Sequence, residues 1–199
     1  MAARPQKRSR ITREKILAVA RTLFDADGYE NVSVDEIARS AGVAKGTVFV
    51  HFPDKASLLT AVRISELEEL LDQTKTRVRQ LEGTDALDII TDLLTPWLAL
   101  FAAHRDFTRI FLNQSELRGG SSALRLYEVC LGLDTALQET VSYLISARAL
   151  TRSVSVNVYT QGILAFFYHV VTGLYSGATS SSDDQKWLLR ALLARWLKK

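Results

Sequence analysis

The spacing of apolar residues along the chain predicts α-helices almost throughout. In the first clear segment, apolar side chains recur three, four, seven and eight positions apart, as on one face of an amphipathic helix. They are Ile16, Val19, Ala20, Leu23 and Phe24. Gly28 ends this segment, and we expect Thr12 to cap its start. No part of the chain alternates apolar and polar residues as a strand would, and the sequence contains no internal repeat.

Residues 33–55 predict two short helices joined by a tight turn. Ser33 and Glu36 have the spacing of a capping box, which satisfies the free amides at a helix start. Gly42 supplies the chain reversal, and Asp54 caps a third helix that begins at Lys55. Two short helices around a glycine turn have the form of a helix-turn-helix, whose second helix enters the DNA major groove.

The remaining pattern predicts further helices, which are separated by short polar breaks. They cover residues 55–81, 85–103, 107–117, 123–148 and 152–177, followed by a last helix that contains Trp187 and Trp196. Pro96 is expected to kink the second of these helices, and residues 119–122 read as a flexible segment. For the helix over 123–148 we expect the inner positions to be Leu124, Tyr127, Leu131, Leu137, Val141 and Leu144.

The distribution of charge says more than its total. The 199 residues carry a formal net charge of only +3, but residues 1–15 hold six basic side chains and one acid, Glu14. Residues 1–10 are therefore either a solvated, disordered tail or an arm that follows phosphates or the minor groove. The single cysteine, Cys130, excludes an intramolecular disulfide and fits a cytoplasmic protein, and it reads as a buried thiol.

One long stretch lacks charge entirely. Residues 153–182 contain no Asp, Glu, Lys or Arg and are numerous enough to span a bilayer, but polar side chains such as Asn157, Gln161 and His169 interrupt them. We therefore expect a buried helix and no membrane contact. Because a helix without a charged face must be covered nearly all round, part of its cover should come from a second subunit.

Three segments carry a resemblance to a known family. TREKIL (12–17), FDADGYENVSVDEIA (24–38) and AGVAKGTVFVHFPDKASLL (41–59) resemble the DNA-binding domain of TetR-type (TetR/AcrR family) transcriptional regulators. The resemblance covers about residues 10–60 and implies an all-α chain. Residues 1–56 would form a three-helix, helix-turn-helix DNA-binding domain with a basic arm, and residues 57–199 a helical domain for effector binding and dimerisation.

By this resemblance the chain is a repressor that a small-molecule effector releases from a palindromic, double-stranded operator. It would act as a homodimer, joined by the two C-terminal helices in a four-helix bundle. The expected DNA contacts combine residue chemistry with position in the motif. They are Thr12, Ser33, Lys45, Gly46, Thr47, Phe49, His51 and Lys55, of which Phe49 stands where the family usually has tyrosine.

Aromatic and histidine side chains of the C-terminal part are the candidates for an effector pocket. They are Trp97, Phe101, His104, Phe107, Phe111, Tyr127, Phe166, Phe167 and His169. Few charged residues accompany them, which favours an uncharged or amphipathic effector of unknown identity.

No enzyme or cofactor motif is found: the chain lacks HExxH, GxSxG and a phosphate-binding glycine loop, so we expect no catalysis, cofactor or metal. Two alternatives to a specific regulator remain. One is a nonspecific DNA-binding protein, and the other is a helical module that binds proteins.

Overall fold

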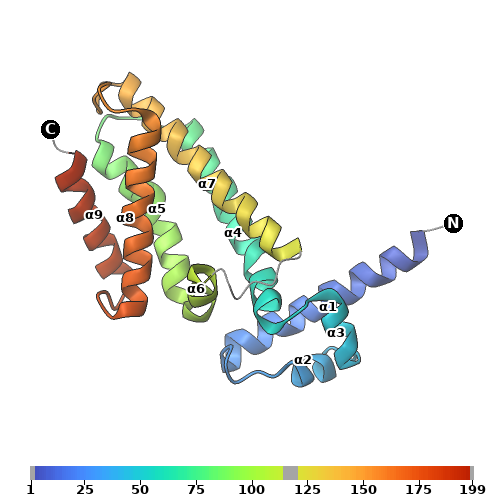
Figure 1. Cartoon of the computed structure of the whole chain (residues 1–199). Helices are drawn as coiled ribbons and strands as arrows, with labels where there is room; N and C mark the ends of the chain where they lie inside the picture. Colours follow the sequence, from blue (N-terminus) through green and yellow to red (C-terminus); the bar gives the residue numbers. More distant parts are fainter. Residues whose placement is uncertain (1–2, 114–120, 198–199) are drawn as a thin grey trace. The chain divides into compact units, whose positions relative to one another are not determined.

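The computed structural model describes residues 3–113 and 121–197, and every regular element within them is an α-helix (Figure 1). In chain order these are α1 (Ala3–Asp27), α2 (Val34–Ser40), α3 (Lys45–His51), α4 (Lys55–Arg79), α5 (Ala86–Ala103), α6 (Arg105–Leu112), α7 (Ser121–Ser146), α8 (Val156–Ser176) and α9 (Ser182–Leu197). The expected all-α fold is confirmed. Of the segment expected to be flexible, residues 119–120 lie outside the described residues, whereas Ser121 and Ser122 form the start of α7 and are not flexible linker.

The chain divides into two compact units. The smaller unit comprises residues 1–66 and 113–127, and the larger unit comprises residues 67–112 and 128–199. The division falls after Glu66, inside α4, whereas residue 56 lies in the first turn of that helix.

Helices α1, α2 and α3 pack together in the smaller unit around small and branched apolar side chains. Ile16, Ile37, Ala41 and Val48 are at most 1% exposed. The Ser33 hydroxyl accepts a hydrogen bond from the Glu36 amide at 3.1 Å, which is the expected cap of α2.

A glycine turn precedes α3, and a helix cap starts α4. Gly42 has a φ of 61°, a left-handed conformation in which a β-carbon would be strained, so the turn before α3 depends on glycine. The Asp54 carboxylate accepts from the Ser57 amide at 2.6 Å and starts α4 as expected.

The start of α1 differs from the expectation. The helix begins at Ala3, so residues 3–10 are helical and not a disordered tail, which leaves the arm that follows phosphates or the minor groove as the open alternative. The Thr12 hydroxyl is not a cap, because it donates to the carbonyl of Arg8 one turn earlier, at 3.0 Å. Residues 6–10 are straight-chain, helix-favouring residues apart from one serine, and Pro5 lies in the first turn, where proline is tolerated.

In the larger unit, α5 contacts α6, α8 and α9. The helix starts at the Asp85 cap and buries eight side chains, among them Leu94, Trp97 and Phe101. Of the described helices, α5 alone has the length and composition that could cross a membrane, but core helices of folded proteins share these properties. Asp88 and Asp92 of α5 pair with Arg190 and Lys186 of α9, which fits a core helix.

Helix α7 buries a different stripe from the one expected. Leu137, Val141 and Leu144 are fully buried as predicted. The other three expected inner positions are wrong: Leu124 and Tyr127 are each 59% exposed and Leu131 is 48% exposed. The buried residues are instead Leu126, Val129, Leu133 and Ala136. Gly132 explains this rotation, because a β-carbon there would lie 2.5 Å from Cδ2 of Leu71, so this side of α7 packs closely on α4.

Candidate nucleic-acid interface

Helix α3 buries one side and presents the other to solvent. Val48 and Phe52, four residues apart, are each 1% exposed and anchor the helix in the smaller unit. The exposed residues are Lys45, Gly46, Phe49 and Val50, with Thr47 and His51 half-buried at the edge. A short helix held by two apolar anchors, with its other side uncovered, has the geometry of a DNA recognition helix.

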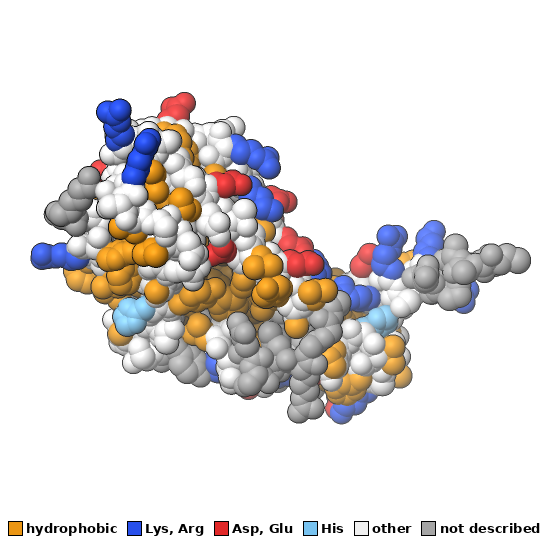
Figure 2. All heavy atoms as spheres, turned by 45° about the horizontal axis from the view of Figure 1, so that its top comes forward, with side chains coloured by type: hydrophobic (Ala, Val, Ile, Leu, Met, Phe, Trp, Pro, Cys, Tyr) orange, Lys and Arg blue, Asp and Glu red, His pale blue; other side chains and the backbone are white. Residues whose placement is uncertain are grey.

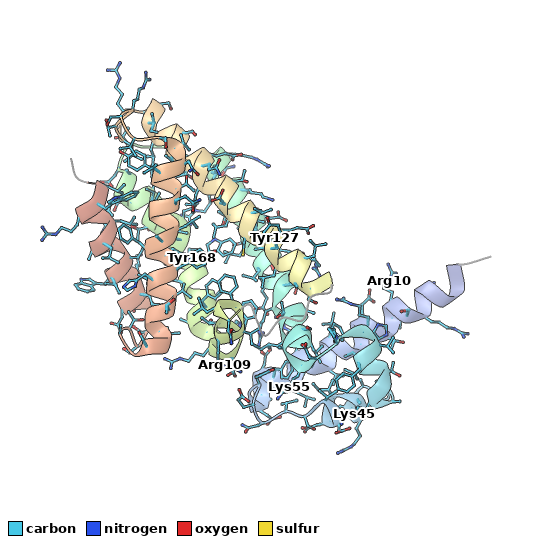
Figure 3. The ribbon with its side chains drawn as sticks, in the orientation of Figure 1. Arg10, Lys45, Lys55, Arg109, Tyr127 and Tyr168 are labelled. Atoms are coloured by element: carbon cyan, nitrogen blue, oxygen red, sulfur yellow. The ribbon has the colours of Figure 1, made fainter. Side chains whose placement is uncertain are left out.

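The lysine at the start of α3 is held by an acid of α2. The Lys45 ammonium lies 2.7 Å from the Asp35 carboxylate, and both side chains are about half exposed. Lys45 is labelled on the smaller unit in Figure 3. A solvent-exposed pair of this kind contributes little to stability, so a DNA phosphate can replace Asp35 as the partner of the ammonium at small cost.

The next residue leaves the surface of α3 open. A β-carbon added to Gly46 would meet no atom within 4 Å. The packing of the smaller unit therefore does not require glycine at this position, and the missing side chain leaves room for another molecule beside α3.

Two apolar side chains dominate the exposed side of α3. Phe49 is 43% exposed and Val50 is 82% exposed, which is unusual for residues of their size. Val50 was not among the residues predicted to contact DNA. Its signal was the helical spacing, because the position lies two residues from each of the buried anchors, Val48 and Phe52, and so points away from the core.

The other predicted DNA contacts have partners within the protein. The Ser33 hydroxyl caps α2, next to the acids Asp35 and Glu36. The Lys55 ammonium lies 4.3 Å from the centre of the Tyr29 ring and donates to the Glu30 carbonyl at 3.4 Å. The structure thus brings Lys45, Gly46, Thr47, Phe49 and His51 together on α3. Thr12, Ser33 and Lys55 lie on other elements.

A second cationic region precedes the core of α1. Lys7, Arg8 and Arg10 are exposed, and blue side chains mark this helix in Figure 2. Arg13 is half-buried, and its guanidinium carbon lies 5.0 Å from the centre of the Phe52 ring. Burial, together with repulsion from Arg125, lowers the pKa of Arg13, and Glu14 partly opposes this shift.

Four of the candidate pocket residues pack against one another in the larger unit. The Phe101 ring lies 4.7 Å from Phe111, 6.1 Å from Phe107 and 6.2 Å from Phe167, centre to centre. His104 ends α5 beside this cluster, and its carbonyl accepts from the Thr108 hydroxyl at 3.0 Å.

The remaining candidate pocket residues lie elsewhere. Trp97 is buried and donates from Nε1 to the Thr74 hydroxyl at 3.0 Å. Phe166 contacts the edge of Trp196, His169 is exposed on α8, and Tyr127 is exposed on α7.

A polar pair adjoins the phenylalanine cluster. Tyr168 stacks on Phe111, with ring centres 6.2 Å apart, and hydrogen-bonds to the Cys130 thiol. Burial, together with the nearby Cys130 and Asp134, raises the pKa of Tyr168 to about 12. Burial also raises the pKa of Cys130, against the hydrogen bond from Tyr168. The thiol is half-buried and protonated at neutral pH, which makes it a poor nucleophile.

The larger unit also has a polar surface hollow of about 350 Å³, lined by Arg105, Asp106, Thr108, Arg109 and Leu174. None of these residues belongs to the predicted pocket. Within the described ranges, no three His, Cys, Asp or Glu side chains are grouped closely enough to bind a metal ion.

The exposed α3 and its two supporting helices define a helix-turn-helix protein. Residues 16–62 match the family model described as "Bacterial regulatory proteins, tetR family". The chain is 27% identical to the HTH-type transcriptional regulator SrpR of Pseudomonas putida over 198 residues, which cover 97% of this chain and 87% of SrpR. It is 27% identical to the regulator AcrR of Shigella flexneri over 156 residues, or 75% of this chain and 72% of AcrR.

The fold agrees with these sequence matches. FadR of Thermus thermophilus, a TetR-family repressor solved with lauroyl-CoA, superposes with a TM-score of 0.67 at 21% identity, over 94% of this chain and 96% of FadR. At this identity the likeness concerns the fold alone. The chain belongs to the TetR family and is a DNA-binding transcriptional regulator.

Proposed function

We propose that this regulator is a homodimeric repressor that binds a specific palindromic operator and leaves it when a small molecule binds the larger unit. The observation that carries the proposal is the uncovered side of α3, which joins a cation, an open glycine and two apolar side chains. Lys45 can contact phosphate, while Phe49 and Val50 suit the methyl groups of thymine in the major groove.

Specific recognition also requires a second copy of α3. One short helix reads too few base pairs to select a site, and helix-turn-helix proteins therefore bind as dimers to half-sites about one helical turn apart. The α8 positions that the structure describes as exposed support such a dimer, because none of them is charged. They are Asn157, Val158, Gln161, Ala165, His169, Thr172 and Ser176. On α9, Trp187 is 71% exposed.

The effector would occupy the region of the phenylalanine cluster. Phe111 and Phe167 are buried apolar side chains, and Tyr168, whose ring contacts both of theirs, adds one polar hydroxyl. This combination suits an uncharged or amphipathic molecule. A coupling of about 1–3 kcal/mol between effector and DNA would weaken DNA binding about 5–150-fold, which is enough to switch a gene.

Selection of bound duplexes tests the proposal directly. The protein is mixed with fragmented genomic DNA, the retained fragments are sequenced, and the affinity of the best fragment is compared with that of a scrambled duplex by fluorescence anisotropy. A preference of about a thousandfold or more supports operator binding. Equal affinities that fall steeply with salt would indicate a nonspecific DNA-binding protein, and no DNA affinity would indicate a protein-interaction module.

The dimer has its own test. Equilibrium ultracentrifugation of the wild-type protein should give a dimer, and W187E should shift it toward the monomer because a charge would enter the interface. V50E places the same charge on the equally exposed α3 and serves as the matched control. A wild-type monomer at micromolar concentration would contradict the dimer.

A further inference from the structure

The N-terminal part of α1 is a rigid extension of the smaller unit. From Lys7 onward, the first fully buried side chain of the helix is Ile16, and Ala20 and Phe24 continue the buried face. The helix nevertheless begins at Ala3, and Figure 1 shows this end projecting past α2 and α3. We name residues 3–12 of α1 the arm.

The arm begins close to α3 in the smaller unit. Arg13, the residue that follows the arm, lies over the ring of Phe52, and Phe52 directly follows α3. The contact fixes where the arm starts relative to α3 within the same unit. A molecule that covers the exposed side of α3 and continues past its end would therefore meet the arm.

The arm is cationic and has little apolar surface. Its described side chains include Lys7, Arg8 and Arg10, all exposed. The acidic residue next to the arm is Glu14, which pairs with Arg10 at 3.6 Å. Both side chains are more than 60% exposed. Ile11, at 51% exposed, is the large apolar residue of this set. A membrane-binding helix needs a continuous apolar face, so this composition favours a phosphate backbone over a bilayer.

We infer that Lys7, Arg8 and Arg10 form an accessory contact to phosphates of the duplex that flanks the sequence read by α3. At about 1.5 Å per residue, ten helical residues reach about 15 Å, the rise of about four base pairs. The contact rests on the proposed operator binding and extends it: the arm lengthens each half-site outward without reading bases. Because the arm is already helical, little chain entropy is lost when it binds.

Charge neutralisation in the arm tests the inference. The variant K7Q/R8Q/R10Q is compared with R79Q/R148Q/R152Q, which removes three exposed cations from the larger unit outside α8 and α9. Affinities are measured between about 50 and 200 mM salt on the selected duplex, on a mixed-sequence duplex of equal length, and on the selected duplex shortened by about four base pairs at each end. Circular dichroism and thermal melting verify that both variants remain folded.

The expected result is a change of salt dependence that is specific to the arm. Log affinity falls with log salt, and the loss of three phosphate contacts should make this negative slope shallower by about 2.7 for each bound arm. Over the fourfold salt range, each bound arm should make wild-type affinity fall about 40-fold more than that of the arm variant, and the two arms of a dimer should multiply this difference. The control variant should follow the wild type, and shortening the duplex should abolish the difference between wild type and arm variant.

Several outcomes would overturn the inference. They are an unchanged salt slope in the arm variant, an equal change in the control variant, and a difference that persists on the shortened duplex. If the arm variant binds vesicles with anionic headgroups less than wild type does but keeps the wild-type DNA affinity, the arm contacts membranes instead. The operator proposal can fail separately from the arm. It fails if the wild-type protein binds the selected and the mixed-sequence duplex equally well. The arm is still tested in that case, because the salt slopes of wild type and arm variant can be compared on the mixed-sequence duplex.

Discussion

The side chain of Arg63 in α4 is 5% exposed, and its guanidinium donates a hydrogen bond to the carboxylate of Asp25 in α1. Its second partner is Glu66 at 3.3 Å, and Glu66 also pairs with Arg21 of α1 at 2.9 Å. Two residues on each helix thus form a network of alternating charge inside the smaller unit. The network attaches the helix that supports α3 to the first half of α4.

We predict that the two ends of this pair respond differently to substitution. D25N leaves the buried Arg63 charge short of a partner, and because Asp25 is 45% exposed the loss should be about 1–3 kcal/mol, below that of a fully buried pair. R63M removes the buried charge itself and leaves acids that water can reach, so it should cost less than D25N. Urea denaturation measures both free energies of unfolding.

The control for this comparison is R21Q. Arg21 is 55% exposed, and its substitution should change stability by at most about 0.5 kcal/mol. If R63M proves more destabilising than D25N, the role of Arg63 is packing of its stem and not charge pairing.

Local signals in the sequence predicted the helix-turn-helix well. The Ser33 and Asp54 caps and the Gly42 turn each depend on residues within a few positions, so their chemistry is visible in the sequence. The same reasoning failed at α1, because Thr12 is a good cap residue but also tolerates a helix interior. For the basic run before it we expected either a disordered tail or a DNA-contacting arm, and the helix preference of its residues was not used.

Features that depend on distant residues could not be predicted. The partner of Arg63 in α1 is 38 residues away, and nothing near Arg63 in sequence shows that its charge is buried. Helix α7 carries two apolar stripes, and the choice between them is made by the close approach of Gly132 to Leu71 of α4. The pocket residues behave likewise: Phe166 faces Trp196 of α9, a contact that helical spacing alone does not reveal.

Val50 should contribute to operator affinity without contributing to stability. Because its side chain is 82% exposed, V50A should leave the free energy of unfolding within about 0.5 kcal/mol of wild type. Operator affinity should fall about 10-fold if Val50 contacts a thymine methyl group. Replacing thymine by deoxyuridine in the selected duplex removes only that methyl group, so at the contacted position it should weaken the wild type but not V50A.

Val158 on α8 provides the matched control for Val50. It is a valine that is 54% exposed, in the other unit. Because Val158 belongs to the proposed dimer surface, the quantity compared is the ratio of affinities for the thymine and deoxyuridine duplexes, which V158A should leave at the wild-type value. Equal responses of wild type and V50A at every thymine would contradict the predicted methyl contact.

Two helical glycines should respond oppositely to alanine. A β-carbon at Gly162 would lie 2.3 Å from the Trp196 ring, which Tyr159 and Phe166 hold by edge contacts, so G162A should destabilise the larger unit by about 1–3 kcal/mol. G46A meets open space in α3 and should stabilise the protein by about 0.5–1 kcal/mol. Thermal and urea unfolding measure both effects.

G46A also tests the interface independently of stability. If DNA approaches α3 at this glycine, the added methyl group should weaken operator binding while the protein becomes more stable. Unchanged DNA affinity in a stabilised G46A would show that the duplex does not approach Gly46.

Tyr168 should make stability fall at high pH. Burial raises its pKa from 10.0 to about 12, so above pH 10 the unfolded chain loses this proton while the folded protein still holds it. Deprotonation therefore favours the unfolded state, and the stabilising contribution is present below pH 10 and is lost as the pH rises through about 12. Y168F has no hydroxyl to ionise at this position, so its free energy of unfolding should decline less than that of wild type between pH 10 and about pH 12.

The control for this prediction is Y143F, which removes the hydroxyl that donates to the Gly83 carbonyl at 2.9 Å. It shows how much stability is lost at high pH for reasons other than Tyr168. Parallel decline of wild type and Y168F would contradict the burial of the Tyr168 hydroxyl beside Cys130.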